Sequence, residues 1–350
     1  MTTFILLDGE MMRRIESVDV FRLFAVFMVI VLHTQPFRLD SANTSWLYEN
    51  LDAFITNAAR FAVPFFFVVS GYFWGVKIRL GEPPLWFSLR KIGRIFTVFL
   101  FWCVVYLVPY DMLGSGKPIW GLILDNIHTL QNQPKVMLLM QGTKLHLWFL
   151  VALMYSMGIS AIFVRNKKIL TLISVALFII GVLAKAYEDT PMGLSLGFNT
   201  LYGPFFGTLF FVSGYHLSGI KMNTKWLLYG FFVFIFGCLL HGSEVWILWK
   251  MFKLAPYEDY VFGTYFMGIG YAMMAFSGHP ALQNRLLGNA GKLALGIYAV
   301  QYMFVDLFSN YDMINNSIAW ELGYVVIVFL LSLLTAYLLS LNKITKQFVA

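Results

Sequence analysis

Residues 17–36, SVDVFRLFAVFMVIVLHTQP, constrain the fold most, because this stretch is apolar enough to cross a membrane yet carries ionisable side chains. Arg22 and His33 are eleven residues apart. At about 3.6 residues per turn, one face of a helix presents both, roughly 16 Å apart along the axis. Ionisable groups within a span usually face a bundle interior or a wet cavity. We therefore predict a polar interior beside this helix. The simpler alternative is that Asp19 and Arg22 only neutralise each other at the membrane edge.

The composition excludes an ordinary soluble protein. The chain has 350 residues, of which 59% are hydrophobic and 12% are charged, and its mean hydropathy is +0.72. Soluble domains contain about 25% charged residues. We therefore predict an all-α polytopic membrane bundle. Two cysteines, Cys103 and Cys238, lie in apolar stretches without a pairing pattern, so neither a disulfide framework nor a metal site is predicted.

Apolar runs predict about ten membrane spans. They cover residues 17–35, 53–75, 95–110, 146–164, 169–186, 200–219, 226–241, 259–278, 293–310 and 318–341.

The basic residues predict the orientation of these spans. One set of alternate connections holds 16 of the 25 Lys and Arg residues, the other set holds 7, and two lie within spans. By the positive-inside rule both termini are cytoplasmic. The net charge of +7 is then explained by the basic residues in the cytoplasmic connections, and we expect no nucleic-acid partner. The predicted organisation is a cytoplasmic leader at 1–16, without a signal-peptide cleavage site, a membrane domain at 17–341 and a cytoplasmic tail at 342–350.

Three further strings carry polar or aromatic residues within spans. Residues 57–75 read NAARFAVPFFFVVSGYFWG and contain Arg60, Ser70 and Tyr72. Residues 145–153, LHLWFLVAL, place His146 and Trp148 at the outer end of the fourth span. Each of these residues also has a purely structural explanation. The serine can serve helix packing, the arginine can extend its charged end to the membrane surface, and the tryptophan can anchor the helix at the interface. A related string, FFVSGY, occurs at 210–215. Either half of the bundle is duplicated, or the similarity is a coincidence.

Together these strings resemble the acyltransferase-3 family of integral membrane acyltransferases. The resemblance rests on the Arg and His of the first span, VPFFFVVSGY in the second and HLWFL in the fourth. Length and these strings look closest to the branch that contains the enterobacterial common antigen O-acetyltransferase. The string LGIYAVQ at 295–301 departs from the family, which often shows His where Gln301 stands, and Gln is no base at neutral pH.

The resemblance implies transfer of an acyl group, acetyl by expectation, from a cytoplasmic acyl-CoA to a hydroxyl of an envelope glycan or its lipid-linked precursor. The resemblance also implies that the protein lies in the bacterial inner membrane, in contact with membrane lipids, and that it has no tightly bound cofactor. His33 suits the role of general base, since its ordinary pKa of about 6.5 lies near working pH. Arg22 would stabilise negative charge or anchor the donor, with Asp19 orienting it.

The remaining expected site residues divide between the two substrates. Substrate-binding candidates are Arg60, Ser70, Tyr72, His146, Trp148 and Gln301. Candidates for the coenzyme A phosphates are Arg22, Arg90, Lys91 and Arg94, of which the last three otherwise serve as orientation signals. Two rival functions stay open: a proton-coupled secondary transporter and a non-catalytic partner in polysaccharide assembly.

Overall fold

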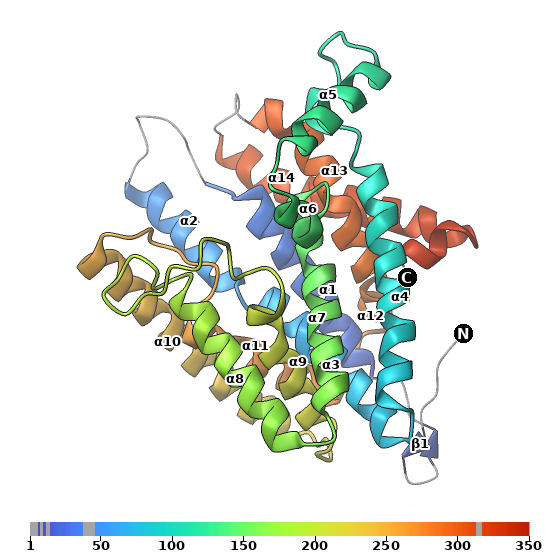
Figure 1. Cartoon of the computed structure of the whole chain (residues 1–350), viewed down its shortest axis with the longest axis vertical. Coiled ribbons are helices and arrows are strands. Elements are labelled where there is room, and N and C mark those ends of the chain that lie inside the picture. Colours follow the sequence, from blue (N-terminus) through green and yellow to red (C-terminus); the bar gives the residue numbers. More distant parts are fainter. Residues whose placement is uncertain (1–5, 8–9, 12–14, 38–45, 313–316, 350) are drawn as a thin grey trace.

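The computed structural model describes residues 6–7, 10–11, 15–37, 46–312 and 317–349, and helices dominate it (Figure 1). The α-helices are α1 Glu16–Thr34, α2 Trp46–Ala59, α3 Ala62–Arg79, α4 Pro84–Val105, α5 Ile119–Gln131, α6 Lys135–Gln141, α7 Trp148–Phe163, α8 Lys167–Leu183, α9 Pro204–Leu217, α10 Trp226–Phe252, α11 Phe262–Phe276, α12 Arg285–Gly291, α13 Ala294–Asp312 and α14 Ile318–Leu341. Short elements are the 3-10 turns η1 Tyr110–Met112, η2 Leu145–Leu147, η3 Pro280–Leu282 and η4 Thr345–Phe348, and the antiparallel two-residue strands β1 Leu6–Leu7 and β2 Glu10–Met11.

Every predicted span contains a helix, but not every helix is long enough to cross a membrane. Within the described residues, six segments have the required length and composition. They are Glu16–Thr34, Asn50–Arg79, Pro84–Met112, Leu145–Phe163, Trp226–Phe252 and Ile318–Leu341. α8, α9 and α11 have 17, 14 and 15 residues, against about 20 for a straight crossing. The membrane-helical class is thus confirmed, whereas the count of ten and the sidedness of the termini stay predictions.

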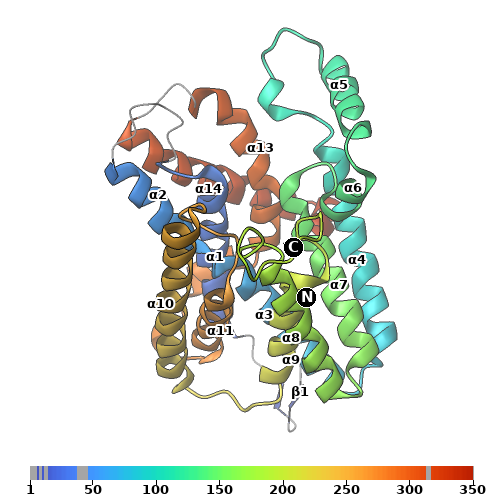
Figure 2. The same cartoon turned by 60° about the vertical axis from the view of Figure 1, so that its left-hand side comes forward.

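α1 occupies the centre of the bundle, with α3, α11, α12, α13 and α14 around it (Figures 1 and 2). Its N-terminal turn is anchored by Ser17, whose hydroxyl donates to the Ala275 carbonyl at 2.7 Å. Gly291 lies directly against the Asp19 backbone, where a side chain would not fit. α4 and α7 flank one side of this core, and α10 and α11 the other, while α5 projects beyond one end (Figure 2).

The two SGY strings pack against each other. α3 and α9 lie side by side, with Gly71 against the Phe211 backbone and Gly214 against the Val68 backbone. The small-residue interpretation therefore holds for the two glycines, because a Cβ at either one would overlap main-chain atoms. Tyr72 belongs to the same packing: its ring stacks on Phe276 at 4.2 Å.

The predicted second span is broken into α2 and α3 at Arg60. Pro64 explains the break, since it has no N–H to donate and its ring clashes with the carbonyl four residues earlier, which is that of Arg60. At this break Arg60 donates to Asp259, which lies in the connection before α11.

α4 begins eleven residues before the range expected for the third span. Pro84 occupies its first turn, where the missing N–H costs nothing. Arg90, Lys91 and Arg94 therefore lie inside the helix rather than ahead of it, which corrects the expected boundary. α10 likewise runs on to Phe252, beyond the expected end at residue 241.

Candidate functional site

A cavity of about 750 Å³ lies between α1, α3, α4, α7 and α13. Arg22 and His33 both line it. Since about 16 Å of helix separates these two residues, the cavity extends through much of the bundle. Arg94 and Lys292 also line it, and we call the end defined by Arg22, Arg94 and Lys292 the basic end.

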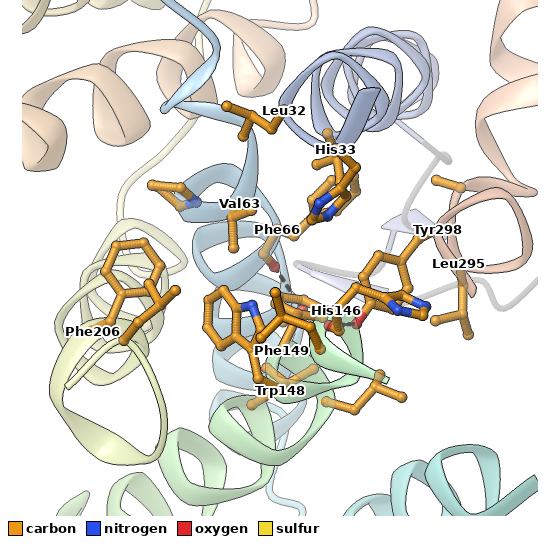
Figure 3. Close-up of a pocket in the computed structure, with 18 of the residues that line it drawn as sticks. Leu32, His33, Val63, Phe66, His146, Trp148, Phe149, Phe206, Leu295 and Tyr298 are labelled. Atoms are coloured by element: carbon orange, nitrogen blue, oxygen red, sulfur yellow. Dashed lines mark hydrogen bonds between the residues drawn. The ribbon is translucent and has the colours of Figure 1, made fainter. Parts of the chain in front are cut away.

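At the other end, which we call the histidine end, two imidazoles share one aromatic neighbour. The rings of His33 and His146 are 6.4 Å apart, and the Tyr302 ring is 4.6 Å from each of them. Figure 3 shows His33 entering from α1 on one side, with His146, Trp148 and Phe149 on the opposite side of the same space. A reacting group between the imidazoles is therefore within reach of a proton-accepting nitrogen.

His146 is held by the start of α7. The 3-10 turn η2 precedes the α-helix, and the Tyr298 hydroxyl donates to the His146 carbonyl. Its Nε2 lies 3.4 Å from the Ala299 carbonyl, which favours a proton on that nitrogen. Nδ1 is buried and has no hydrogen-bond partner in the described part of the chain. A lone pair on Nδ1 is thus available to a bound molecule.

The basic end is built around an ion pair. Arg22 Nη1 donates to Asp19 Oδ1 at 2.8 Å, and Asp19 is buried. The guanidinium lies over the Phe73 ring at 5.5 Å. This contact fixes the direction of Arg22 while leaving part of its side chain exposed to the cavity.

A second ion cluster lies at the histidine end. Asp259 accepts from Arg60 at 3.0 Å, and its other oxygen is 3.3 Å from Lys185 Nζ. Burial raises the pKa of the Asp259 carboxyl, but the positive charges of Arg60 and Lys185 outweigh burial and hold this pKa below its ordinary value. Burial, helped by the charge of Asp259, raises the pKa of the neighbouring Glu258 to about 7.

Glu258 makes the protein's stability depend on pH. The folded pKa of about 7 lies above the ordinary value, so the folded state holds an extra proton between roughly pH 4.5 and 7 and loses stability as the pH rises through this window. We expect Glu258→Gln to abolish this loss, worth about 1–2 kcal/mol after solvent screening. Melting temperatures in detergent at pH 5 and pH 8 measure it. Glu82→Gln, at an exposed glutamate, is the control; an equal pH dependence in wild type and Glu258→Gln contradicts the assignment.

The cavity brings together seven of the predicted site residues. They are Arg22, His33, Arg60, Ser70, Arg94, His146 and Trp148.

Five predicted residues do not line the cavity. Asp19 acts on it through Arg22, and Tyr72 is in helix packing. Arg90 is 70% exposed and pairs with Glu82, and Lys91 lies over Phe87. Gln301 is fully buried. Neither amide atom of Gln301 has a partner among the described residues.

Sequence reasoning missed several lining residues. Tyr298 and Tyr302, four apart on α13, share a helix face with each other, so the LGIY string could have suggested both. Asn199, Tyr202 and Asp259 lie in connections between helices, where no periodicity marks them. Among the described residues, no group of three or more His, Cys, Asp or Glu could hold a metal ion.

The apolar helices indicate a membrane protein, and the cavity between them is lined by ionisable side chains. A family model described as an acyltransferase domain, that of the acyltransferase-3 family, matches residues 15–340. The chain belongs to this family, which is named for acyl transfer.

The curated proteins that match this chain are less than 25% identical to it. An amino-acid racemase of Enterococcus faecalis is 24% identical over an alignment of 371 positions, which covers 96% of this chain and 48% of that protein. A second amino-acid racemase of the same organism is 23% identical over 238 residues, which cover 63% of this chain and 31% of its own length. The chain thus spans about half the length, or less, of the curated relatives it matches. No solved structure matches.

Proposed function

We propose that the protein is an O-acyltransferase of the bacterial inner membrane that moves an acyl group, acetyl first among candidates, from cytoplasmic acyl-CoA to a hydroxyl of an envelope glycan or its lipid-linked precursor. One observation carries the proposal: a single cavity is lined both by the cations Arg22, Arg94 and Lys292 and by the imidazoles of His33 and His146. The cations can bind phosphates, and an imidazole can accept the proton of a hydroxyl.

The basic end is the proposed seat of the coenzyme A phosphates. Arg22, Arg94 and Lys292 present positive charge there, and Arg and Lys are the usual phosphate ligands. The pantetheine arm is a chain of rotatable bonds that would lie along the cavity toward His33. Because Arg22 is about 16 Å from His33 along α1, we assign it to donor binding rather than to charge stabilisation at the thioester.

At the histidine end, His33 takes the proton of the acceptor hydroxyl as its oxygen attacks the thioester carbonyl. The carbon–sulfur bond then breaks, and the leaving thiolate takes the proton from the His33 imidazolium, so no net proton is released. Arg60 lines the same cavity as His33. It is therefore the proposed cation for the negative charge that develops on the carbonyl oxygen in a site sheltered from water.

Transfer of label from radiolabelled acetyl-CoA to extracted surface glycans tests the proposal, with membranes that contain or lack the protein. Label on a glycan only when the protein is present is the expected result. Absence of label with every acyl-CoA offered, although the protein accumulates, would contradict the proposal and favour the carrier interpretation.

We expect Arg94→Gln to raise the KM for acetyl-CoA about tenfold with little change in kcat, because a charge-assisted phosphate contact is worth about 1.5–3 kcal/mol. Arg165→Gln, at an exposed position between α7 and α8, is the matched control and should behave as wild type. Equal KM values for the two variants would remove Arg94 from the donor site.

A further inference from the structure

Tyr302 is the side chain on the cavity wall that contacts both imidazoles of the histidine end. Its ring centroid is 4.6 Å from that of His33, with the planes tilted by 58°. It is also 4.6 Å from that of His146, and these two rings stack with only 19° between their planes. The side chain lines the cavity. Tyr302 therefore lies beside the position at which His33 would take the proton of the acceptor hydroxyl.

The hydroxyl of Tyr302 is not used by the fold. Ser70, Tyr298 and Tyr302 line the cavity from α3 and α13. Ser70 donates to the Phe66 carbonyl at 2.7 Å, and Tyr298, which Figure 3 shows beside His146, donates to the His146 carbonyl. The Tyr302 hydroxyl makes no hydrogen bond within the described part of the chain. Its O–H group is consequently available to a bound molecule.

The ring of Tyr302 is held by contacts that reach outside the cavity lining. Besides the stacking on His146, the Lys144 ammonium lies 5.3 Å from the Tyr302 ring centroid. Lys144 forms an ion pair with Asp306, and the two side chains are 26% and 11% exposed, so water screens the pair only in part. Asp306 is four residues beyond Tyr302 on α13, so one helix face carries both the ring and the anchor of its cation.

The proposed reaction needs a hydrogen-bond donor that neither histidine supplies. As the acceptor oxygen attacks, an electron pair of the thioester carbonyl moves onto the carbonyl oxygen, which becomes negatively charged. His33 is committed to taking the acceptor proton. His146 directs its Nε2 proton at the Ala299 carbonyl, and Nδ1 then carries no proton. A tyrosine hydroxyl is neutral at physiological pH and can donate to such an oxygen.

We propose that Tyr302 is a catalytic residue whose hydroxyl donates a hydrogen bond to the acyl carbonyl oxygen during transfer, and that the ion pair of Lys144 and Asp306 positions its ring. The inference rests on the proposed function. The hydrogen bond strengthens while the oxygen carries negative charge, and it weakens when the carbonyl forms again and the carbon–sulfur bond breaks. Tyr302 keeps its proton throughout, so the proton still passes from the acceptor through His33 to the leaving thiolate.

Tyr302→Phe removes the hydroxyl and keeps the ring with its stacking contacts. We expect kcat to fall about 10²- to 10³-fold, as for loss of one donor to such an oxygen, with little change in the KM for acetyl-CoA. Initial rates of label transfer from acetyl-CoA, in membranes with equal amounts of each variant, measure both constants. Tyr229→Phe, at an exposed position on α10, is the matched control and should behave as wild type.

Lys144 tests the positioning part of the proposal. Lys144→Gln removes the charge that lies over the ring, and we expect kcat to fall roughly tenfold, the size of a partly desolvated cation–π contact. Lys144→Arg keeps the charge and the pairing with Asp306 and should restore most of the rate. Equal losses in Lys144→Gln and Lys144→Arg would contradict the positioning role.

A fluorinated tyrosine at position 302 separates hydrogen-bond donation from a purely structural role. It keeps the ring and the hydroxyl but makes the phenol more acidic, and only the protonated phenol can donate. We therefore expect the alkaline limb of the pH–rate profile to move to lower pH than in the wild-type protein. This variant also decides the question if Tyr302→Phe fails to accumulate as folded protein.

The failures of the two proposals are distinguishable. Transfer at the wild-type rate by Tyr302→Phe, a change in KM alone, or an unmoved alkaline limb with the fluorinated tyrosine would each overturn the role of Tyr302 and leave the proposed function standing. Absence of transfer by the wild-type protein with every acyl-CoA offered would overturn the proposed function and the role of Tyr302 with it.

Discussion

His33→Ala is expected to reduce acyl transfer by 10²- to 10⁴-fold, the range usual for loss of a positioned general base. His33 is on the wall of the cavity, 4.6 Å from Tyr302 and 6.4 Å from His146 between ring centroids. Removing its imidazole leaves the acceptor hydroxyl with no proton acceptor at this position. The KM for acetyl-CoA should change little, because the proposed phosphate ligands are at the other end of the cavity.

The measurement is the initial rate of label transfer from acetyl-CoA in membranes with equal amounts of each variant. His128→Ala is the matched control, since His128 is exposed on α5, away from the cavity. Transfer at the wild-type rate by His33→Ala would exclude His33 as the base. A loss equal to that of His128→Ala would show that the assay reports a general effect of histidine removal.

Gly71→Leu is expected to prevent accumulation of folded protein, and Gly71→Ala to lower the free energy of unfolding by about 3 kcal/mol or more. A Cβ at Gly71 would overlap the Phe211 carbonyl, and backbone cannot move aside as a flexible side chain can. Inserting even one methyl group into close packing typically costs about 1–3 kcal/mol, and here α3 and α9 would have to separate.

Gly93 provides the control for this test, because it is also a glycine within a helix and nothing lies within 4 Å of the position of its added Cβ. Gly93→Leu and Gly93→Ala should therefore accumulate normally. Size-exclusion profiles and melting temperatures in detergent compare the four variants. Similar profiles for Gly71→Leu and Gly93→Leu would show that α3 and α9 do not pack as closely as described.

Periodicity and composition were enough to locate the helices. Each predicted span contains a helix, because a membrane helix requires a continuous run of apolar residues, and such a run is visible in the sequence. Single prolines moved the boundaries: Pro64 divides the second span, and Pro84 starts α4 early. These effects are local, but their outcome depends on whether neighbouring elements can satisfy the freed backbone groups.

The sequence by itself also placed Arg22 and His33 on one helix face, because a helical repeat converts their spacing directly into direction. It indicated seven of the residues that line the cavity, most of them through a string with a family resemblance. Its assignment of Arg90 and Lys91 to the donor could not be separated from orientation signalling, since both roles require only positive charge near a membrane edge.

The tertiary structure alone decided which of these residues meet. Tyr302 contacts two histidines, one from α1 and one from η2, and Asp259 joins Arg60 to Lys185 across three separate segments. The two SGY strings could have marked a site or a packing contact. Gly71 and Gly214 make the packing contact between α3 and α9, whereas Ser70 lines the cavity. These contacts join residues that are far apart in the sequence, and helix packing, rather than any local repeat, sets them.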